Sequence, residues 1–275
     1  MSPHPTLDRK NVLVGAVRTA YIDHGSGETI VALHGIPTSS RLFEPLAPLI
    51  PGFRLLAPDL LGQGKTAVPP RGRLGHAEYR RHLAMFLDLL APPHFHLMVH
   101  DFGGVLGLEW AADHPDRVKT LTVLSTTARW TLRWTLLGRS IYAANLLFGA
   151  NVLPLALQAT LVRQAPLPDD LIDEWAAPWS RRRILRGFDH FSRRHLARLQ
   201  SKLPKLRSPL LLLWGENDYV FPLDHANAIA RLVPQAKLVT IAHCGHWATL
   251  DAPVEVAAAL LQFAGGPPAA RTNRR

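Results

Sequence analysis

The strongest constraint on the fold of this chain is a regular alternation of short apolar runs with longer segments of helical periodicity. Such alternation is typical of a mostly parallel β-sheet with helices on both faces. Helices are expected at Arg41–Leu49, His76–Leu90, Val105–Asp113, Leu223–Leu232 and Pro253–Phe263. The apolar runs predict eight strands, at Asn11–Val14, Arg18–Asp23, Thr29–Leu33, Arg54–Pro58, His94–Val99, Lys119–Ser125, Leu210–Trp214 and Lys237–Ile241.

The alternation stops between residues 127 and 204, after the sixth expected strand. This stretch is rich in helical pattern and holds four tryptophans, Trp130, Trp134, Trp175 and Trp179. An insertion at this point would lie above the carboxyl ends of the strands, where open α/β sheets bind ligands. We therefore expect an α/β core of residues 1–126 and 205–264, a helical cap of residues 127–204, and a disordered tail of residues 265–275.

The most specific local motif is Val99-His100-Asp101-Phe102-Gly103-Gly104, which joins the fifth expected strand to the next helix. A strand, a sharp turn and a helix, with small residues after the turn, form a nucleophile elbow that raises one side chain above the sheet. The side chain here is a carboxylate, which with an ordinary pKa of about 3.9 is ionised at neutral pH. It needs no base for its attack and can displace a leaving group from saturated carbon.

Three further motifs follow a fixed order along the chain. His34-Gly35-Ile36-Pro37 ends the third expected strand, Asp218 follows the seventh, and His246 lies in Cys244-Gly245-His246-Trp247 after the last. The order nucleophile, acid, histidine is that of α/β hydrolases. The position after the sixth strand reads Ser125-Thr126-Thr127 and holds no acid, which favours Asp218 as the partner of the histidine. Glu216 is the alternative acid.

From about residue 18 to 264 the chain resembles the α/β-hydrolase superfamily, and residues 100–104 are similar to its aspartate-nucleophile branch. That branch contains haloalkane dehalogenases, epoxide hydrolases and haloacetate dehalogenases. Residues 34–40, His-Gly-Ile-Pro-Thr-Ser-Ser, resemble the oxyanion loop of haloalkane dehalogenases. Residues 244–247 resemble the histidine motif of epoxide hydrolases, which serine-dependent carbon–carbon bond hydrolases share. The implied fold is an α/β-hydrolase fold, a mostly parallel eight-stranded sheet flanked by helices, with a helical cap inserted after strand 6.

The resemblance implies a role for each motif. Asp101 would attack an electrophilic carbon and form an alkyl-enzyme ester. His246, oriented by Asp218, would then activate water against that ester. The backbone N–H groups of Ile36 and Phe102 would form the oxyanion hole. His34 and His100 are expected to support the site through hydrogen bonds rather than to take part in the chemistry.

The leaving group stays open, with a haloalkane dehalogenase-like enzyme favoured and an epoxide hydrolase as the alternative. Dehalogenases of this branch bind the halide with side-chain N–H donors, commonly a Trp after the nucleophile. Phe102 and Ile36 offer no such donor, so an indole would have to come from Trp130, Trp134, Trp175 or Trp179. Epoxide hydrolases protonate the opening oxygen, for which Tyr142 with His190 is the available acid pair. Another ester or lactone hydrolase, or a non-catalytic sensor of a small ligand, is less favoured.

Composition bounds the partners and the setting. The net charge of +10 raises the question of nucleic acid, but no recognition module is present, so we interpret the charge as a solvated basic face. The single cysteine and an N-terminus without an apolar segment favour a cytoplasmic protein. Residues 141–162 form an uncharged run of membrane-spanning length, but Asn145, Asn151, Pro154 and Gln158 argue against its insertion into a membrane.

The apolar and aromatic cap composition predicts a dry pocket for a small hydrophobic substrate. No His, Cys and Asp set has ligand spacing and no phosphate loop is present, so neither a metal nor a cofactor is expected. Oligomeric state is not readable from the sequence.

Overall fold

The computed structural model describes residues 6–69, 74–130, 140, 143–144, 157–163, 167–178 and 192–265, together with the backbone of residues 179 and 180. Trp134, Tyr142, His190 and the side chain of Trp179 lie outside the described residues, as does the predicted tail beyond Gly265.

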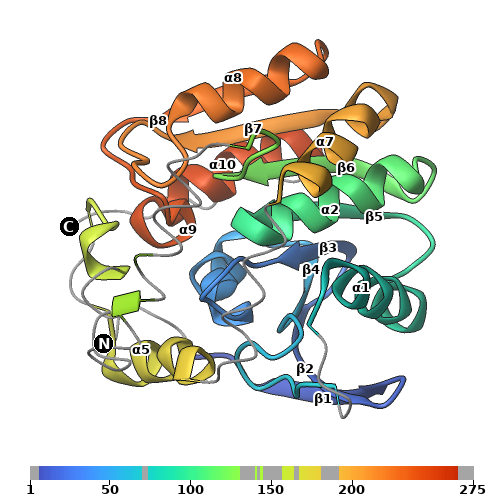
Figure 1. Ribbon diagram of the computed structural model, residues 1–275, viewed down its shortest axis with the longest axis vertical. Coiled ribbons are helices and arrows are strands. Elements are labelled where there is room, and N and C mark those ends of the chain that lie inside the picture. The colour runs from blue at the N-terminus through green and yellow to red at the C-terminus, as the bar shows by residue number, and fades with distance from the viewer. Residues whose placement is uncertain are drawn as a thin grey trace.

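A single eight-stranded sheet forms the centre of the molecule, in the order β1-β2-β4-β3-β5-β6-β7-β8 (Figure 1). β2 pairs antiparallel with β1 and β4, and the strands from β4 to β8 are parallel. The predicted α/β-hydrolase sheet is thereby confirmed, with every strand end within two residues of its expected place. The strands are β1 (Arg9–Val14), β2 (Val17–Gly25), β3 (Glu28–Leu33), β4 (Phe53–Pro58), β5 (Phe95–His100), β6 (Val118–Leu124), β7 (Leu210–Gly215) and β8 (Lys237–Ile241).

Helices cover both faces of the sheet. Helix α2 (Asp101–Asp113) packs between α1 (His76–Leu90) and α7 (Arg193–Lys202), and α8 (Leu223–Leu232) packs on β7. The segment η1 (Ser40–Leu49) packs against α9 (Ala248–Asp251) and α10 (Pro253–Ala264). β5 and β7 are buried along their whole length, so β7 is continuously apolar up to its final Gly215, and β5 is apolar except for His96 and His100.

Two expected helices differ from the structure. The segment η1 is a 3-10 helix rather than an α-helix, because Pro45 and Pro48 lack the N–H groups that i to i−4 bonding requires. Helix α2 begins at Asp101 rather than Val105, because the turn of the elbow is confined to a single residue.

The predicted cap range contains helix α5 (Asp169–Ala176), the short 3-10 helix η3 (Ala177–Ser180) and α7. Figure 1 shows α5 beside the end of the sheet that carries β1. The boundaries of a separate cap, residues 127–204, stay a prediction.

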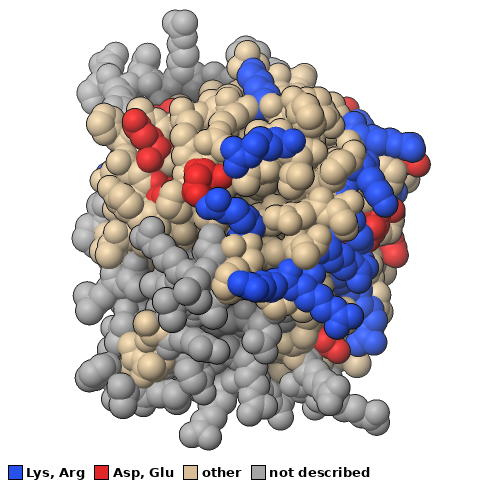
Figure 2. Space-filling model, turned by 45° about the horizontal axis from the view of Figure 1, so that its top comes forward, with Lys and Arg blue, Asp and Glu red and all other residues tan. Residues whose placement is uncertain are grey.

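Charged side chains are spread unevenly over the surface. Figure 2 shows Lys and Arg gathered over much of one side of the molecule, with fewer Asp and Glu among them. A solvated basic face fits this picture, and the expectation that no nucleic acid binds stays a prediction. Within the described part of the chain, no helix has the length and apolar character that a membrane crossing requires.

Candidate active site

Asp101 occupies a strained elbow between β5 and α2. Its φ of 51° lies in the left-handed region, which is unfavourable for a residue with a side chain. Its N–H donates to the carbonyl of Ser125 at 3.1 Å, and the Thr126 hydroxyl donates to its carbonyl at 2.5 Å. Both bonds come from the end of β6, so the neighbouring strand holds the elbow in place.

The two glycines after Asp101 are required by close packing. A Cβ at Gly103 would lie 2.5 Å from the carbonyl oxygens of Leu33 and His34, and one at Gly104 would lie 2.3 Å from the Thr126 hydroxyl. The small residues of the elbow motif therefore allow α2 to start directly against β3 and β6.

The two oxygens of the Asp101 carboxylate have different surroundings. Oδ1 accepts a hydrogen bond from the Ile36 N–H at 2.9 Å, and the Phe102 N–H also donates to this carboxylate. Oδ2 lies 3.8 Å from Nε2 of His246, too far for a direct hydrogen bond. The two backbone groups predicted to form an oxyanion hole thus already contact the carboxylate before any substrate is present.

Burial changes the acidity of this side chain. Asp101 is 1% exposed, and the loss of water raises its pKa to about 6, although His246 and the two N–H groups oppose the shift. The pKa is therefore higher than the ordinary value assumed from sequence. At neutral pH about nine-tenths of the carboxylates are still ionised.

Asp218 and His246 form a buried pair beside this carboxylate. Nδ1 of His246 lies 3.1 Å from Oδ2 of Asp218, whose Oδ1 accepts 2.9 Å bonds from the N–H groups of Val220 and Phe221. Glu216, the alternative acid, is exposed. Burial by itself lowers the pKa of His246, but Asp218 and Asp101 outweigh it, and the pKa is raised. With the Nδ1 proton shared with Asp218, Nε2 faces Asp101 as a base.

The two remaining predicted histidines both make buried hydrogen bonds at the site. Nε2 of His34 accepts from the Leu60 N–H at 2.8 Å while Nδ1 donates to the Gly35 carbonyl, which requires a neutral ring. Nε2 of His100 donates to the carbonyl of His246 at 3.0 Å. Burial lowers the pKa of both rings. Each therefore joins two loops of the site in its uncharged form.

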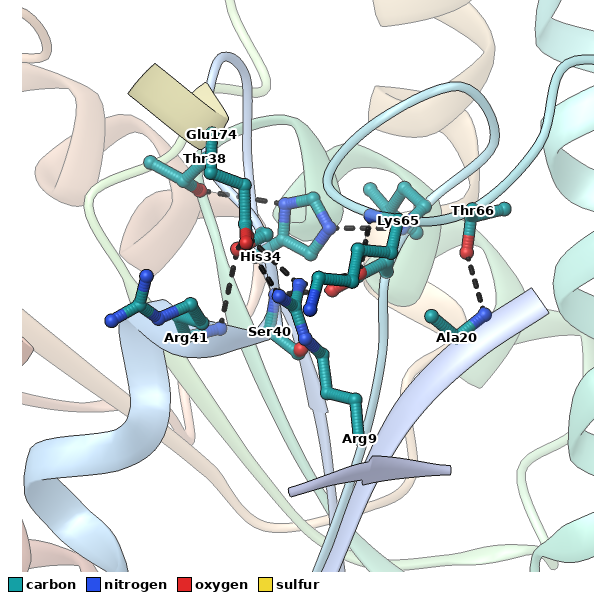
Figure 3. A network of polar contacts seen from close by, with 12 residues as sticks. Arg9, Ala20, His34, Thr38, Ser40, Arg41, Lys65, Thr66 and Glu174 are labelled. Carbon is teal, nitrogen blue, oxygen red and sulfur yellow. Dashed lines mark hydrogen bonds and ion pairs between the residues drawn. The ribbon is translucent and has the colours of Figure 1, made fainter. Parts of the chain in front are cut away.

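A polar network connects the loop that carries Ile36 to helix α5 (Figure 3). The Ser39 hydroxyl donates to Glu174 at 2.6 Å, and Glu174 also accepts two bonds from Arg9 of β1. Arg9 reaches Asp59 as well, and Asp59 accepts the N–H of Ser40 at 2.8 Å. The predicted oxyanion loop is thus held from both sides, by the core and by α5.

Of the tryptophans predicted to line a pocket, the structure describes the side chains of Trp130 and Trp175, and Trp247 lies next to His246 in the chain. The indole of Trp175, which is fully buried, donates to Ser39 at 3.1 Å. Trp247 donates to the Thr160 hydroxyl at 2.5 Å. Trp130 is half-buried, with the Arg193 guanidinium 4.1 Å above its ring. The expected roles of Trp134, Trp179, Tyr142 and His190 fall outside the described side chains.

Several residues of this region were not anticipated from sequence. Arg9 and Glu174 are 165 positions apart, and no local pattern marks such a pair. Asp251 accepts three backbone N–H groups, from Gly245 in the His246 loop and from Val162 and Arg163. These partners are distant in the sequence from Asp251 or carry no distinctive side chain, so no local pattern marks the contact.

Comparison with known proteins gives the class first. A family model described as alpha/beta hydrolase fold matches residues 28–253. The chain belongs to this family, and it is a hydrolase of the α/β fold.

Individual relatives differ in their activities. The chain is 28% identical over 271 residues to a cis-3-alkyl-4-alkyloxetan-2-one decarboxylase of Shewanella oneidensis, covering 88% of this chain and 84% of the relative. It is 37% identical to a haloalkane dehalogenase of Sphingobium indicum over 129 residues, 45% of this chain and 44% of the relative. A haloalkane dehalogenase crystal structure from Agrobacterium tumefaciens has a TM-score of 0.80 at 21% identity, covering 94% of this chain and 96% of that one. The last likeness concerns the fold alone.

Proposed function

We propose that this protein hydrolyses a small hydrophobic substrate through a covalent ester on Asp101. The observation that carries the proposal is that the two oxygens of the buried Asp101 carboxylate have different surroundings. Its Oδ1 accepts the Ile36 N–H, while its Oδ2 faces His246 without a direct bond. An oxygen that accepts a backbone hydrogen bond is the poorer nucleophile, so we propose Oδ2 as the attacking atom.

In the first step, Oδ2 bonds to a saturated carbon of the substrate, and the leaving group departs with the electrons of the broken bond. Oδ1 becomes the carbonyl oxygen of the new ester. It stays in contact with the Ile36 N–H, and the Phe102 N–H already donates to the same carboxyl group, so both donors are in place before the second step.

In the second step, Nε2 of His246 takes a proton from water, and the resulting hydroxide adds to Cγ of Asp101. The charge that develops on Oδ1 is stabilised by the same two N–H groups. The Cγ–Oδ2 bond then breaks, and the departing alkoxide takes the proton from His246. The proton left on the Asp101 carboxyl passes to solvent and restores the carboxylate. Asp218 stabilises the imidazolium during this step.

For the leaving group, we propose a strained lactone ring as the first candidate. When Oδ2 attacks the saturated ring carbon that is bonded to the ring oxygen, that oxygen leaves as part of a carboxylate. The negative charge is then spread over two oxygen atoms. A halide needs fixed N–H donors, and the indoles of Trp175 and Trp247 already donate to Ser39 and Thr160. The Shewanella oneidensis relative, which matches most of the chain, is named for a four-membered lactone with two alkyl groups.

Alkyl halides are the second candidate. The resemblance of residues 34–40 to the oxyanion loop of haloalkane dehalogenases favours them, as does the Sphingobium indicum relative. Epoxides depend on Tyr142 and His190, so they enter as a third arm of the test.

The covalent step is tested with His246→Gln. Attack by Asp101 does not use the histidine, whereas release of the ester does, so this variant is expected to accumulate an adduct. Intact-mass spectrometry after incubation with a dialkyl β-lactone, a bromoalkane or an aryl epoxide measures it, and peptide mapping assigns it to Asp101. Asp101→Asn is the matched control and should stay unmodified. Absence of an adduct with all three reagents contradicts the proposal.

Products of the native protein separate the substrate classes. A lactone gives a β-hydroxy acid, a bromoalkane gives bromide and an alcohol, and an epoxide gives a diol. If the ester formed from a lactone instead loses carbon dioxide, the electron pair of the broken carbon–carbon bond becomes the second bond of an alkene. The bond between Oδ2 and the substrate carbon breaks at the same time, which regenerates the Asp101 carboxylate with its original oxygen. In heavy-oxygen water under single-turnover conditions, hydrolysis should leave the label in Asp101. Label in the first product, with none in the protein, rules out the ester.

A further inference from the structure

The loop that carries His246 is gripped by a segment far away in the sequence, residues 160–163. Asp251, at the end of α9, is the centre of the contact: its Oδ2 accepts the N–H of Gly245 at 2.7 Å. The same carboxylate accepts the N–H groups of Val162 and Arg163, each at 3.1 Å. Asp251 is buried, so these three donors satisfy a carboxylate that would otherwise be costly to remove from water.

Arg163 adds a second set of bonds to the same loop. Its Nε donates to the His243 carbonyl at 2.7 Å, and a second nitrogen donates to the Ala242 carbonyl. A third contact is the 2.5 Å ion pair with Glu255 of α10. His243 has a φ of 50°, so Arg163 spans a strained turn directly between β8 and the catalytic histidine.

The residue after His246 is tied to the same segment. Trp247 donates its indole N–H to the Thr160 hydroxyl. On the other side, a Cβ at Gly245 would lie 2.4 Å from the Thr160 carbonyl oxygen, so only glycine allows this approach. Both neighbours of His246 in the chain therefore rest against residues 160–163.

From this arrangement we infer that Asp251 and Arg163 are positioning residues that align His246 for hydrolysis of the Asp101 ester. The inference rests on the proposed function. It predicts an effect confined to the second step, because attack by Asp101 uses Ile36 and Phe102 but not His246. The imidazole must keep Nδ1 on Asp218 and Nε2 towards Cγ of Asp101, and a displacement of about 1 Å can reduce a rate about a hundredfold.

Arg163→Ala is the main test, since this side chain is partly exposed and the Asp251 bonds to the backbone remain. We expect ester formation at a near-native rate and ester hydrolysis slowed about tenfold to a hundredfold, so that the adduct accumulates in the steady state. Rapid-quench intact-mass measurements follow both steps. Asp251→Asn, which loses one accepting oxygen, should act in the same direction.

The matched control is Arg129→Ala, which removes an ion pair to Asp224 of α8, an element other than the His246 loop. It should leave both rates unchanged. Equal slowing of both steps in Arg163→Ala, no slowing of hydrolysis, or the same effect in Arg129→Ala would overturn the inference.

A second readout does not depend on turnover. The low-field proton that Nδ1 of His246 shares with Asp218 should shift or broaden in the NMR spectrum of Arg163→Ala but not of Arg129→Ala. If His246→Gln forms no adduct, the proposed function fails. The NMR signal then still tests, independently of the reaction, whether Arg163 positions His246. An unchanged signal in Arg163→Ala then refutes it.

Discussion

The buried carboxylate of Asp101, the proposed nucleophile, opposes folding when it is charged. Its carboxylate is removed from water, its backbone sits at positive φ, and only the Ile36 and Phe102 N–H groups and the neighbouring His246 favour its charged form. A carboxyl group whose pKa is higher in the folded than in the unfolded state destabilises the fold once it ionises. The folded pKa is about 6, against 3.8 for the unfolded chain.

Asp101→Asn should therefore stabilise the protein at high pH. The native fold loses stability as pH rises from about 3.8 to 6 and stays weaker above that range, whereas asparagine carries no charge and keeps an oxygen for the Ile36 N–H. Two pKa units correspond to at most about 3 kcal/mol in the free energy of unfolding. Urea unfolding at pH 8 measures the gain, which should shrink towards pH 4. A variant no more stable than the native protein at pH 8 would contradict this account.

What sequence could predict at this scale was the identity of the chemical groups. The order of Asp101, Asp218 and His246 along the chain pointed to one cluster, and the structure brings the three together. The raised pKa of Asp101 could not be predicted, because it depends on burial by residues from distant segments. The engagement of the Trp175 and Trp247 indoles was equally hidden, since their partners, Ser39 and Thr160, lie 136 and 87 positions away.

Among the elements, α5 is the clearest case of a helix placed by buried charges. Glu174 joins it to Arg9 and Ser39, and Asp170 joins it to Arg41. The two acids differ in exposure: the Glu174 side chain is 13% exposed and that of Asp170 is 68%. Buried and exposed ion pairs on one short helix can thus be compared directly.

Glu174→Ala is expected to lower the free energy of unfolding by about 1–3 kcal/mol, because Arg9 and Ser39 lose a buried partner. Arg9 keeps Asp59, which limits the loss. Asp170→Ala, the control on the same helix, should cost less than about 1 kcal/mol, since Arg41 keeps Glu44 and the Asp170 side chain is exposed. Chemical denaturation of both variants checks the contrast, and equal losses would refute it.

Helix and strand positions were largely predictable from periodicity. α1 and α8 begin and end at the expected residues, because their apolar faces are marked at helical spacing. Pro45 and Pro48 indicate the 3-10 geometry of η1, but the helical periodicity of Arg41–Leu49 predicts only a helix and not its type. The start of α2 was placed too late, since a one-residue turn cannot be distinguished from a longer one by composition.

Across the whole molecule, a second charged cluster joins helices of the core to one from the predicted cap range. Glu109 of α2 is buried and contacts His76 and Arg80 of α1, and Arg198 and Lys202 of α7. Burial alone would raise the pKa of Glu109, but the hydrogen bond from His76 and the charges of Arg80 and Lys202 lower it to about 2. Part of the positive charge of the sequence therefore forms ion pairs with a buried carboxylate.

Glu109→Gln tests how much this cluster stabilises the molecule. A carboxylate with a folded pKa near 2 and an unfolded pKa of 4.5 contributes stability above pH 4.5, which is lost as pH falls towards 2. The variant should lose at most about 3 kcal/mol at pH 7, because the partners of Glu109 lose its buried charge, although Arg80 and Lys202 keep Asp113. Its deficit relative to the native protein should close between pH 4.5 and 2 in denaturation experiments. A deficit that does not change with pH would argue against the ion pairs as its source.

Two loops of the proposed active site are each held by a segment far away in the sequence: α5 binds Ser39, and residues 160–163 contact Gly245 and Trp247. A displacement of α5 would therefore act on the loop that carries the Ile36 N–H. A displacement of residues 160–163 would act on the loop that carries His246. Under the proposed function, mutations in these two distant segments would change the reaction although neither segment supplies a reacting group.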